Sequence, residues 1–255
     1  MNLNNKILVV TGVSSGIGAE LARLARFQGA RVIGVDRHEP QLTLDSFYQA
    51  DLGDPDSINA LVGQLPGQID GLCNIAGVPG TAPVETVARV NYLGLRHLTQ
   101  RLLPRIVAGG SIVNIASVLG AQWPERLELH KALAATESYN DGLHWLAANP
   151  VAQETCYQYF KEALIVWTFQ QSQAWFRDQS VRVNCVAPGP VFTPILGDFV
   201  TMLGEARVAR DGLRMKRPAQ ADEVAEVIAF LCSDASRWVN GVNLPVDGGL
   251  AATYV

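Results

Sequence analysis

The chain has 255 residues, with 24 acidic and 20 basic side chains and a formal net charge of −4. This length suits one or two domains, and the acidic balance argues against a nucleic-acid-binding surface. No apolar stretch reaches the roughly 18 residues typical of a membrane span. The first residues, MNLNNKILVVTG, lack the long apolar run of a signal peptide. We therefore expect a cytoplasmic protein whose partners are neither nucleic acids nor membranes.

Cysteine and histidine positions do not form a metal-ligand pattern. The cysteines, at positions 73, 156, 185 and 232, are scattered and contain no CxxC pair, which is typical of reduced, buried thiols. The histidines, at positions 38, 97, 130 and 144, are expected to have surface or capping roles. We expect no metal site.

Short apolar runs alternate with helical stretches along the chain. The first strand is expected at residues 6–10, followed by a helix over about 18–28 that ends at Gly29. Further strands are expected just before Asp51 and at residues 31–36, 70–77, 110–117, 181–189 and 242–249. Buried strands alternating with helices indicate an α/β fold, a Rossmann-like doubly wound parallel sheet with helices on both faces. No linker or repeat interrupts the pattern, so we expect a single domain over residues 1–255.

Two segments depart from the plain alternation. Residues from about 121 to 154 form a helical insertion, and residues from about 190 to 218 follow a strand end. Ligands of such folds bind at the carboxyl edge of the sheet, so both segments are expected to shape a substrate pocket there. Trp123, Trp145 and Phe192 are candidate pocket residues, and packing in a core or interface is an equally good interpretation of each.

The stretch TGVSSGIG, residues 11–18, lies between the first strand and the first helix. Gly12 suits a tight turn, while Gly16 and Gly18 allow a pyrophosphate to approach the backbone and the helix to pack on the strand. The free N–H groups and the dipole of the helix favour an anion at this position. A glycine-rich turn without a ligand is the competing interpretation.

Acidic residues after the next two strands favour a nucleotide. Asp36, at the end of the second expected strand, is placed to accept hydrogen bonds from an adenosine ribose and would repel a 2′-phosphate, which predicts NAD rather than NADP. Arg37 could offset part of that repulsion, although a solvated surface charge is the simpler role. Asp51 could bond the adenine edge, or it could be an ordinary turn residue.

The stretch CYQYFKEAL, residues 156–164, contains two tyrosines and a lysine. A helix turns about 400° over four residues, so Tyr157 and Lys161 share one face and Tyr159 lies on the opposite side. A free phenol has a pKa near 10, and lowering it by about three units requires roughly 4 kcal/mol. An ammonium group about 4 Å away supplies about that much at an effective dielectric constant near 20. The pair is therefore expected to form an acid or base that works near neutral pH.

Together, these motifs resemble the classical short-chain dehydrogenase/reductase family over essentially the whole chain. The matching pieces are TGVSSGIG, NIAG at 74–77, VN at 90–91, Ser117, YQYFK at 157–161 and PGPVFT at 188–193. The resemblance implies a catalytic tetrad of Asn91, Ser117, Tyr157 and Lys161. In it, Tyr157 exchanges the substrate proton, Ser117 holds the substrate oxygen, Lys161 holds the nicotinamide ribose, and Asn91 supports a proton-relay water.

The motifs and the resemblance together predict the contacts of an NAD cofactor. The expected contacts are Gly12, Ser14, Ser15, Gly16, Ile17, Gly18, Asp36, Arg37, Asp51, Leu52, Asn74, Ala76, Gly77, Tyr157, Lys161, Pro188, Gly189, Val191 and Thr193.

The chain departs from the family pattern between Ser117 and Tyr157, which are 40 residues apart. The usual separation is much shorter, so an insertion lies between the two catalytic side chains. Because the usual family tetramer packs the Tyr157 helix against a neighbour, the insertion could block that face. We expect a homodimer or a homotetramer, and favour a dimer formed through residues 222–244.

An insertion at this place is typical of a smaller branch of the family. The stretches DGLCNIAGVPGTA, VNYLGL, CYQYFKEALIVW and APGPVFTPIL resemble members that oxidise an aromatic allylic alcohol to its aldehyde. The resemblance thus implies a small apolar or aromatic alcohol or carbonyl substrate. A 3α-hydroxysteroid or another carbonyl compound is the alternative substrate. A nucleotide-sensing protein without catalysis is the alternative of a different class, although such proteins generally lose part of the Ser–Tyr–Lys set.

Overall fold

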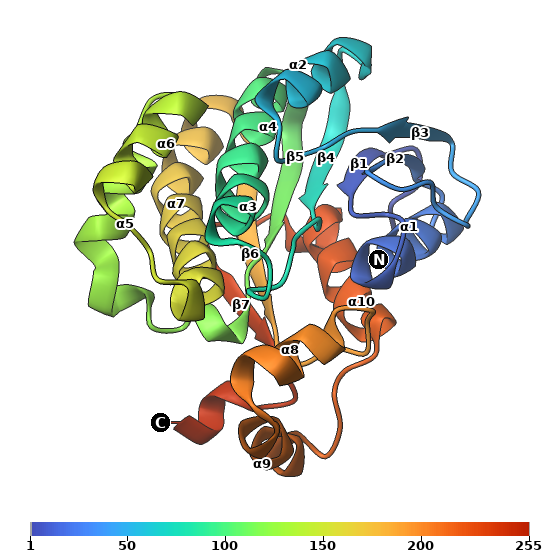
Figure 1. The fold of residues 1–255 in the computed structure, drawn as a ribbon. Coiled ribbons are helices and arrows are strands. Elements are labelled where there is room, and N and C mark those ends of the chain that lie inside the picture. The colour runs from blue at the N-terminus through green and yellow to red at the C-terminus, as the bar shows by residue number, and fades with distance from the viewer. Residues whose placement is uncertain (1, 255) are drawn as a thin grey trace.

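Seven parallel strands form the centre of the protein, and the computed structural model describes residues 2–254. The strands are ordered β3-β2-β1-β4-β5-β6-β7 across the sheet (Figure 1). They are β1 (Ile7–Thr11), β2 (Arg31–Asp36), β3 (Ser46–Gln49), β4 (Ile69–Asn74), β5 (Ile106–Ile115), β6 (Arg182–Pro188) and β7 (Asn243–Val246). The chain order reverses between β1 and β4, which is the switch point of a doubly wound sheet. The predicted α/β fold class is confirmed.

Helices cover both faces of this sheet (Figure 1). On one face, α1 (Gly16–Phe27) packs against α10 (Ala221–Cys232). The other face carries α2 (Pro55–Gln64), α4 (Leu95–Leu102) and the long α7 (Cys156–Gln179). The remaining helices are α3 (Val84–Ala88), α5 (Leu127–Ala134), α6 (Tyr139–Ala148), α8 (Leu196–Leu203) and α9 (Glu205–Met215). Among the described residues, no helix combines the length and the apolar character that crossing a membrane requires.

Local sequence signals fix several helix ends. Asp54 accepts a hydrogen bond from the Asp56 backbone N–H at the start of α2, and Pro55 occupies the first helical position. Ser138 and Asp141 form a reciprocal capping box at the start of α6. At the end of α1, Gly29 has a φ of +87°, a left-handed conformation that glycine adopts without strain.

The insertion between Ser117 and Tyr157 packs against the outer side of α7. Helix α7 is buried on most of its sides, because the sheet covers one side and α5 lies along another (Figure 1). Tyr139, at the start of α6, donates a hydrogen bond of 2.7 Å to the Gly53 carbonyl. The insertion thus extends the hydrophobic core outwards, and it forms no separate layer over the carboxyl edge of the sheet.

A buried charged cluster joins the insertion to α7. Glu162 is fully buried, and its carboxylate lies 3.1 Å from Arg126 Nε and 2.8 Å from His130 Nε2. The His130 ring also packs edge-on against Tyr159, with the ring centroids 4.7 Å apart. The expected surface or capping role is therefore wrong for His130, which lies in the interface between α5 and α7. The reason is that the Glu162 carboxylate can be buried only with partners that satisfy it.

Candidate active site

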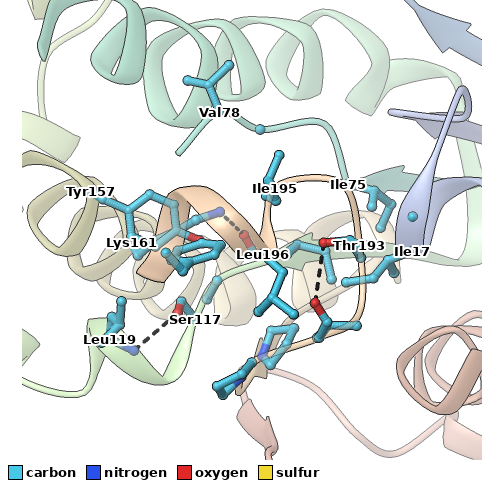
Figure 2. A pocket seen from close by; sticks show the side chains of 18 of the residues that line it. Ile17, Ile75, Val78, Ser117, Leu119, Tyr157, Lys161, Thr193, Ile195 and Leu196 are labelled. Carbon is cyan, nitrogen blue, oxygen red and sulfur yellow. Dashed lines mark hydrogen bonds between the residues drawn. The ribbon is translucent and has the colours of Figure 1, made fainter. Parts of the chain in front are cut away.

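A large cavity of about 860 Å³ lies at the carboxyl edge of the sheet. It extends from the glycine-rich turn before α1 to the Ser117, Tyr157 and Lys161 side chains, as Figure 2 shows. Helices α8 and α9 lie beyond the same edge of the sheet and form the outer wall of the cavity (Figure 1). The cavity therefore occupies the position at which ligands bind in doubly wound folds.

The backbone packs so closely at the glycine-rich turn that Gly12 and Gly18 have no space for a side chain. A Cβ atom on Gly12 would lie 2.9 Å from the Ala76 backbone nitrogen, and one on Gly18 would lie 2.1 Å from the Gly12 carbonyl oxygen. Ser15 precedes α1 without a side-chain cap, and the first turn of α1 contains no acidic residue. The free N–H groups and the helix dipole therefore face the cavity and suit a pyrophosphate.

Asp36 is held in place at the end of β2. One carboxylate oxygen accepts a hydrogen bond of 2.9 Å from the Ser14 backbone N–H, and the other accepts one of 3.0 Å from the His38 backbone N–H. Asp36 and Arg37 both line the cavity beside the glycine-rich turn. This places a fixed carboxylate at the position where dinucleotide folds bind an adenosine ribose.

The adenine end of the proposed cofactor site is formed by the loop after β3. Asp51 and Leu52 line the cavity, together with Ala50. The Asp51 carboxylate accepts a hydrogen bond of 2.8 Å from the Gly53 N–H. Asp51 thus stabilises its own turn while it borders the cavity, so both interpretations of this residue apply.

Tyr157 and Lys161 project from one face of α7 into the cavity, and Ser117 approaches from the end of β5 (Figure 2). The Lys161 ammonium donates a hydrogen bond of 2.6 Å to the Ile115 carbonyl and lies 5.5 Å from the centre of the Tyr157 ring. Ser117 Oγ accepts a hydrogen bond of 3.2 Å from the Leu119 N–H. Three groups from two distant parts of the chain therefore meet in one cavity.

Burial shifts the proton affinities of this pair. Desolvation raises the pKa of the Tyr157 phenol well above its ordinary value, and a hydrogen bond with Ser117 partly opposes this rise. Desolvation also lowers the pKa of Lys161 from 10.5 to about 8. Burial of the phenol therefore works against the lowering of its pKa that the spacing of Tyr157 and Lys161 predicts.

Asn91 lies in a π-helical turn, Arg89–Gly94, just before α4. Its amide is held by the Val78 backbone, since Oδ1 accepts a hydrogen bond from the Val78 N–H and Nδ2 donates one to the Val78 carbonyl, both at 2.8 Å. Asn91 does not itself line the cavity. A Cβ on Gly77 would lie 3.2 Å from Asn91 Oδ1 and 3.9 Å from Lys161 Nζ, so Gly77 keeps open the space between these two side chains.

Asn74 is the predicted cofactor contact that the structure places elsewhere. Its side-chain amide donates to Thr99 Oγ1 at 2.9 Å and to Asn114 Oδ1 at 2.8 Å, beneath the cavity and not in its lining. This prediction needs correction, because a buried amide has to satisfy its donors and does so here within the core. Every other predicted cofactor contact borders the cavity.

The substrate side of the cavity differs from the expectation. The segment 190–218 supplies much of its wall, but the insertion contributes only Ala121 and Gln122. Trp123 packs edge-on against Phe169, and Trp145 packs on the core, so neither lines the cavity; nor does Phe192, which is 47% exposed.

Sequence reasoning also missed residues of the substrate side. Phe199 of α8 lies edge-on against the Tyr157 ring at 5.1 Å, and only the amphipathic pattern of α8 could have indicated it. The C-terminal residues Leu250, Ala251 and Tyr254 also border the cavity. The DGG turn at residues 247–249 is a sequence signal that the chain turns just before these residues. Asp247 fixes this turn, since it accepts hydrogen bonds from the Gly249 and Ala251 N–H groups.

This arrangement is suited to proton exchange with a substrate oxygen. The Tyr157 phenol is an acid or base beside the Ser117 hydroxyl, so it is placed to exchange a proton with an oxygen that Ser117 holds. The glycine-rich turn and Asp36 provide the place for a dinucleotide next to that oxygen. The geometry therefore supports an alcohol–carbonyl interconversion with a nicotinamide cofactor.

Family models match the chain over most of its length. A model described as short chain dehydrogenase matches residues 6–128, and one described as enoyl-(acyl carrier protein) reductase matches residues 145–251. The interval between them, residues 129–144, lies inside the insertion.

Known proteins resemble the chain from end to end. It is 65% identical to coniferyl-alcohol dehydrogenase of Pseudomonas sp. (strain HR199 / DSM 7063), covering 100% of both chains. It is 31% identical to 3-alpha-hydroxysteroid dehydrogenase/carbonyl reductase of Comamonas testosteroni, covering 96% of each. The structure of 3-alpha-hydroxysteroid dehydrogenase from Pseudomonas sp. B-0831 complexed with NADH superposes with a TM-score of 0.80 and 29% identity, covering 97% of this chain and 98% of that one. Fold, site geometry and sequence similarity agree, and this chain belongs to the short-chain dehydrogenase/reductase family of oxidoreductases.

Proposed function

We propose that this chain is an NAD-dependent alcohol dehydrogenase that oxidises coniferyl alcohol, an aromatic allylic alcohol, to its aldehyde. The observation that carries the proposal is the 65% identity over the full length with a coniferyl-alcohol dehydrogenase, in a chain whose Ser117, Tyr157 and Lys161 share one cavity.

The protein residues have separate tasks in this reaction. When bound, NAD supplies the hydride acceptor. Ser117 Oγ hydrogen-bonds the substrate hydroxyl and holds it near Tyr157, whose phenolate oxygen takes the hydroxyl proton. Lys161 provides a positive charge 5.5 Å from the phenol ring, which favours the phenolate once it forms. The Ile115 carbonyl holds the ammonium in that place.

Apolar side chains next to Tyr157 suit the aromatic part of the substrate. The wall contains Leu119 from the short 3-10 turn after β5 and Leu196, Phe199 and Leu203 from α8. Helix α8 is joined to the loop after β4 by a hydrogen bond of 2.8 Å from Thr81 Oγ1 to Asp198. A flat phenylpropenyl group would bury its apolar surface against these residues.

A substrate panel tests the proposal. Purified protein with NAD is assayed with coniferyl alcohol and with androsterone, a 3α-hydroxysteroid, by following NADH absorbance. We expect turnover of coniferyl alcohol. Turnover of the steroid alone would reject the proposal in favour of the second candidate function, which the 31% identity to a hydroxysteroid dehydrogenase supports.

The proposed preference for NAD over NADP depends on Asp36. Its carboxylate would lie beside the 2′-phosphate of NADP, where like charges repel by a few kcal/mol at an effective dielectric constant near 20. We expect Asp36→Ala to raise the ratio of kcat/KM with NADP to that with NAD by about 10- to 100-fold. Asp36→Asn removes the negative charge but keeps the shape of the side chain, because the amide oxygen can still accept a hydrogen bond from the Ser14 N–H. Unchanged ratios in both variants would contradict this role.

A homodimer through residues 222–244 is the proposed assembly. The insertion helix α5 covers the outer side of α7, which the family tetramer uses. Between α10 and β7, Trp238 is 87% exposed and lies 5.9 Å from the Phe176 ring, which leaves an apolar surface for a partner. Light scattering of the purified protein tests this proposal; a tetramer or a monomer would reject it.

A further inference from the structure

A charged and polar cluster lies at the end of the cavity that α9 and the C-terminal segment form. It consists of Arg207 and Asp211, one turn apart on α9, and Tyr254, all of which line the cavity. Helices α8 and α9 also give the cavity wall the apolar residues Phe199, Val200, Leu203 and Val208, and Phe199 contacts the Tyr157 ring. The proposed catalysis uses no residue of the cluster.

Asp211 is a carboxylate with one oxygen satisfied and one oxygen not. The residue is only 6% exposed. Its Oδ1 accepts a hydrogen bond of 2.6 Å from the Tyr254 hydroxyl, and Arg210 Nε lies 3.6 Å from the same oxygen. Oδ2 accepts no hydrogen bond from residues 2–254, and its nearest cation is Arg207 Nε at 3.7 Å. This carboxylate oxygen can therefore accept a hydrogen bond from a ligand donor.

Arg207 has a hydrogen-bond donor that lacks an acceptor among the described residues. Its Nε is buried and has no hydrogen-bond partner within the part of the chain that the structure describes. The 3.7 Å to Asp211 Oδ2 is too long for a hydrogen bond. An N–H donor and a carboxylate oxygen thus lie side by side at the cavity wall, and neither satisfies the other.

A hydroxyl group suits both charged groups. It donates a hydrogen bond to Asp211 Oδ2 and accepts one from the Arg207 guanidinium, whose side chain is 41% exposed. An ether oxygen can only accept, and a carboxylate would be repelled by Asp211. The apolar residues of α8 and α9 in the same wall favour a hydroxyl carried by an apolar body whose other end reaches Ser117.

We propose that Arg207 and Asp211 bind the phenolic hydroxyl of the substrate and so select 4-hydroxylated aryl allylic alcohols. The inference rests on the proposed oxidation of an aromatic allylic alcohol and assigns the recognition of its far end. Tyr254 is a positioning residue, because its hydroxyl orients the Asp211 carboxylate.

Three alcohols that differ only at the para position test this selection. They are 4-hydroxycinnamyl, 4-methoxycinnamyl and cinnamyl alcohol, assayed with the full chain and NAD. We expect the wild-type kcat/KM to be at least about tenfold higher for the 4-hydroxy compound than for the other two, because a site built for a hydroxyl rejects analogues that lack the donor. Equal kcat/KM for the three alcohols would overturn the inference and leave the proposed function standing. Turnover of none of them, or of coniferyl alcohol, would reject the proposed function itself.

Variants then assign the selection to the two residues. Arg207→Met keeps the apolar stem of a side chain that is 41% exposed, and Asp211→Asn keeps the shape of the side chain but removes its charge. Each variant is expected to lower the ratio of kcat/KM for 4-hydroxycinnamyl to cinnamyl alcohol about tenfold, mainly through KM. Arg210→Met is the matched control, since Arg210 faces the same carboxylate from outside the cavity lining and should leave the ratio within about twofold. If both variants keep the wild-type ratio, the cluster serves only to attach the C-terminal segment to α9.

Discussion

Replacing Tyr157 with phenylalanine is expected to lower kcat/KM for alcohol oxidation by about 10²- to 10⁴-fold, the usual contribution of a general acid or base. The phenol is buried between Ser117 and Lys161, and its ring also packs on Phe199. Phenylalanine keeps the ring and its contacts, so only the proton-exchanging oxygen is lost. Steady-state assays with coniferyl alcohol and NAD measure the effect.

Tyr159→Phe is the control for this substitution. Tyr159 lies on the opposite side of α7, where its ring packs on His130 at 4.7 Å, and it does not line the cavity. We expect this variant to keep kcat/KM within about threefold of wild type. NADH binding, followed by fluorescence, should also persist in Tyr157→Phe. A Tyr157→Phe protein that binds NADH and matches wild type in every assay would favour the alternative of a nucleotide-sensing protein.

The pH dependence of the reaction follows from the same phenol. Burial raises the pKa of Tyr157, so at neutral pH the protonated form predominates until positive charge nearby favours the phenolate. Oxidation requires the phenolate, and carbonyl reduction requires the phenol. We therefore expect kcat/KM for oxidation to rise with pH and that for reduction to fall, a pattern that Tyr157→Phe should abolish.

Much of the fold and of the catalytic centre follows from local sequence patterns. The strands at residues 31–36 and 181–189 and the glycine-rich turn at 11–18 occur where the pattern predicts them, within a residue or so. The helical spacing of Tyr157 and Lys161 correctly separates them from Tyr159, because the periodicity of a helix alone decides which residues share a face.

Features that depend on distant partners could not be predicted in the same way. The apolar and acidic residues of the insertion suit an outer helix as well as a pocket wall, and only the docking of His130 and Arg126 on Glu162 shows that α5 packs on α7. The amide of Asn74 matches a family motif, but its donors bond Thr99 and Asn114, which are distant in sequence. The Tyr254–Asp211 contact joins residues 43 positions apart, beyond any local periodicity.

The second large effect concerns Lys161, whose replacement by methionine should abolish most activity and yet stabilise the fold. The ammonium is almost fully buried, and the fall of its pKa from 10.5 to about 8 corresponds to roughly 3 kcal/mol of destabilisation at neutral pH. Methionine removes that penalty but leaves the Ile115 carbonyl without its donor, which offsets about 1 to 2 kcal/mol. We expect a net gain of about 1 to 2 kcal/mol at pH 7, or a rise in Tm of a few degrees.

The pH dependence of the stability difference between wild type and Lys161→Met distinguishes the effect of the buried charge from a general change in packing. Below pH 8 both the folded and the unfolded wild-type chain carry the proton, so the penalty is fully present. Between pH 8 and 10.5 the folded chain has released its proton while the unfolded chain retains it, so wild-type stability rises with pH relative to the variant. The advantage of Lys161→Met in urea denaturation should therefore shrink between pH 7 and pH 9.5.

Lys131→Met, in which the lysine replaced is 44% exposed, should show no such change. A pH-independent difference between wild type and Lys161→Met would mean that the buried charge does not destabilise the fold, and that Lys161 is held in its catalytic place without an energetic penalty.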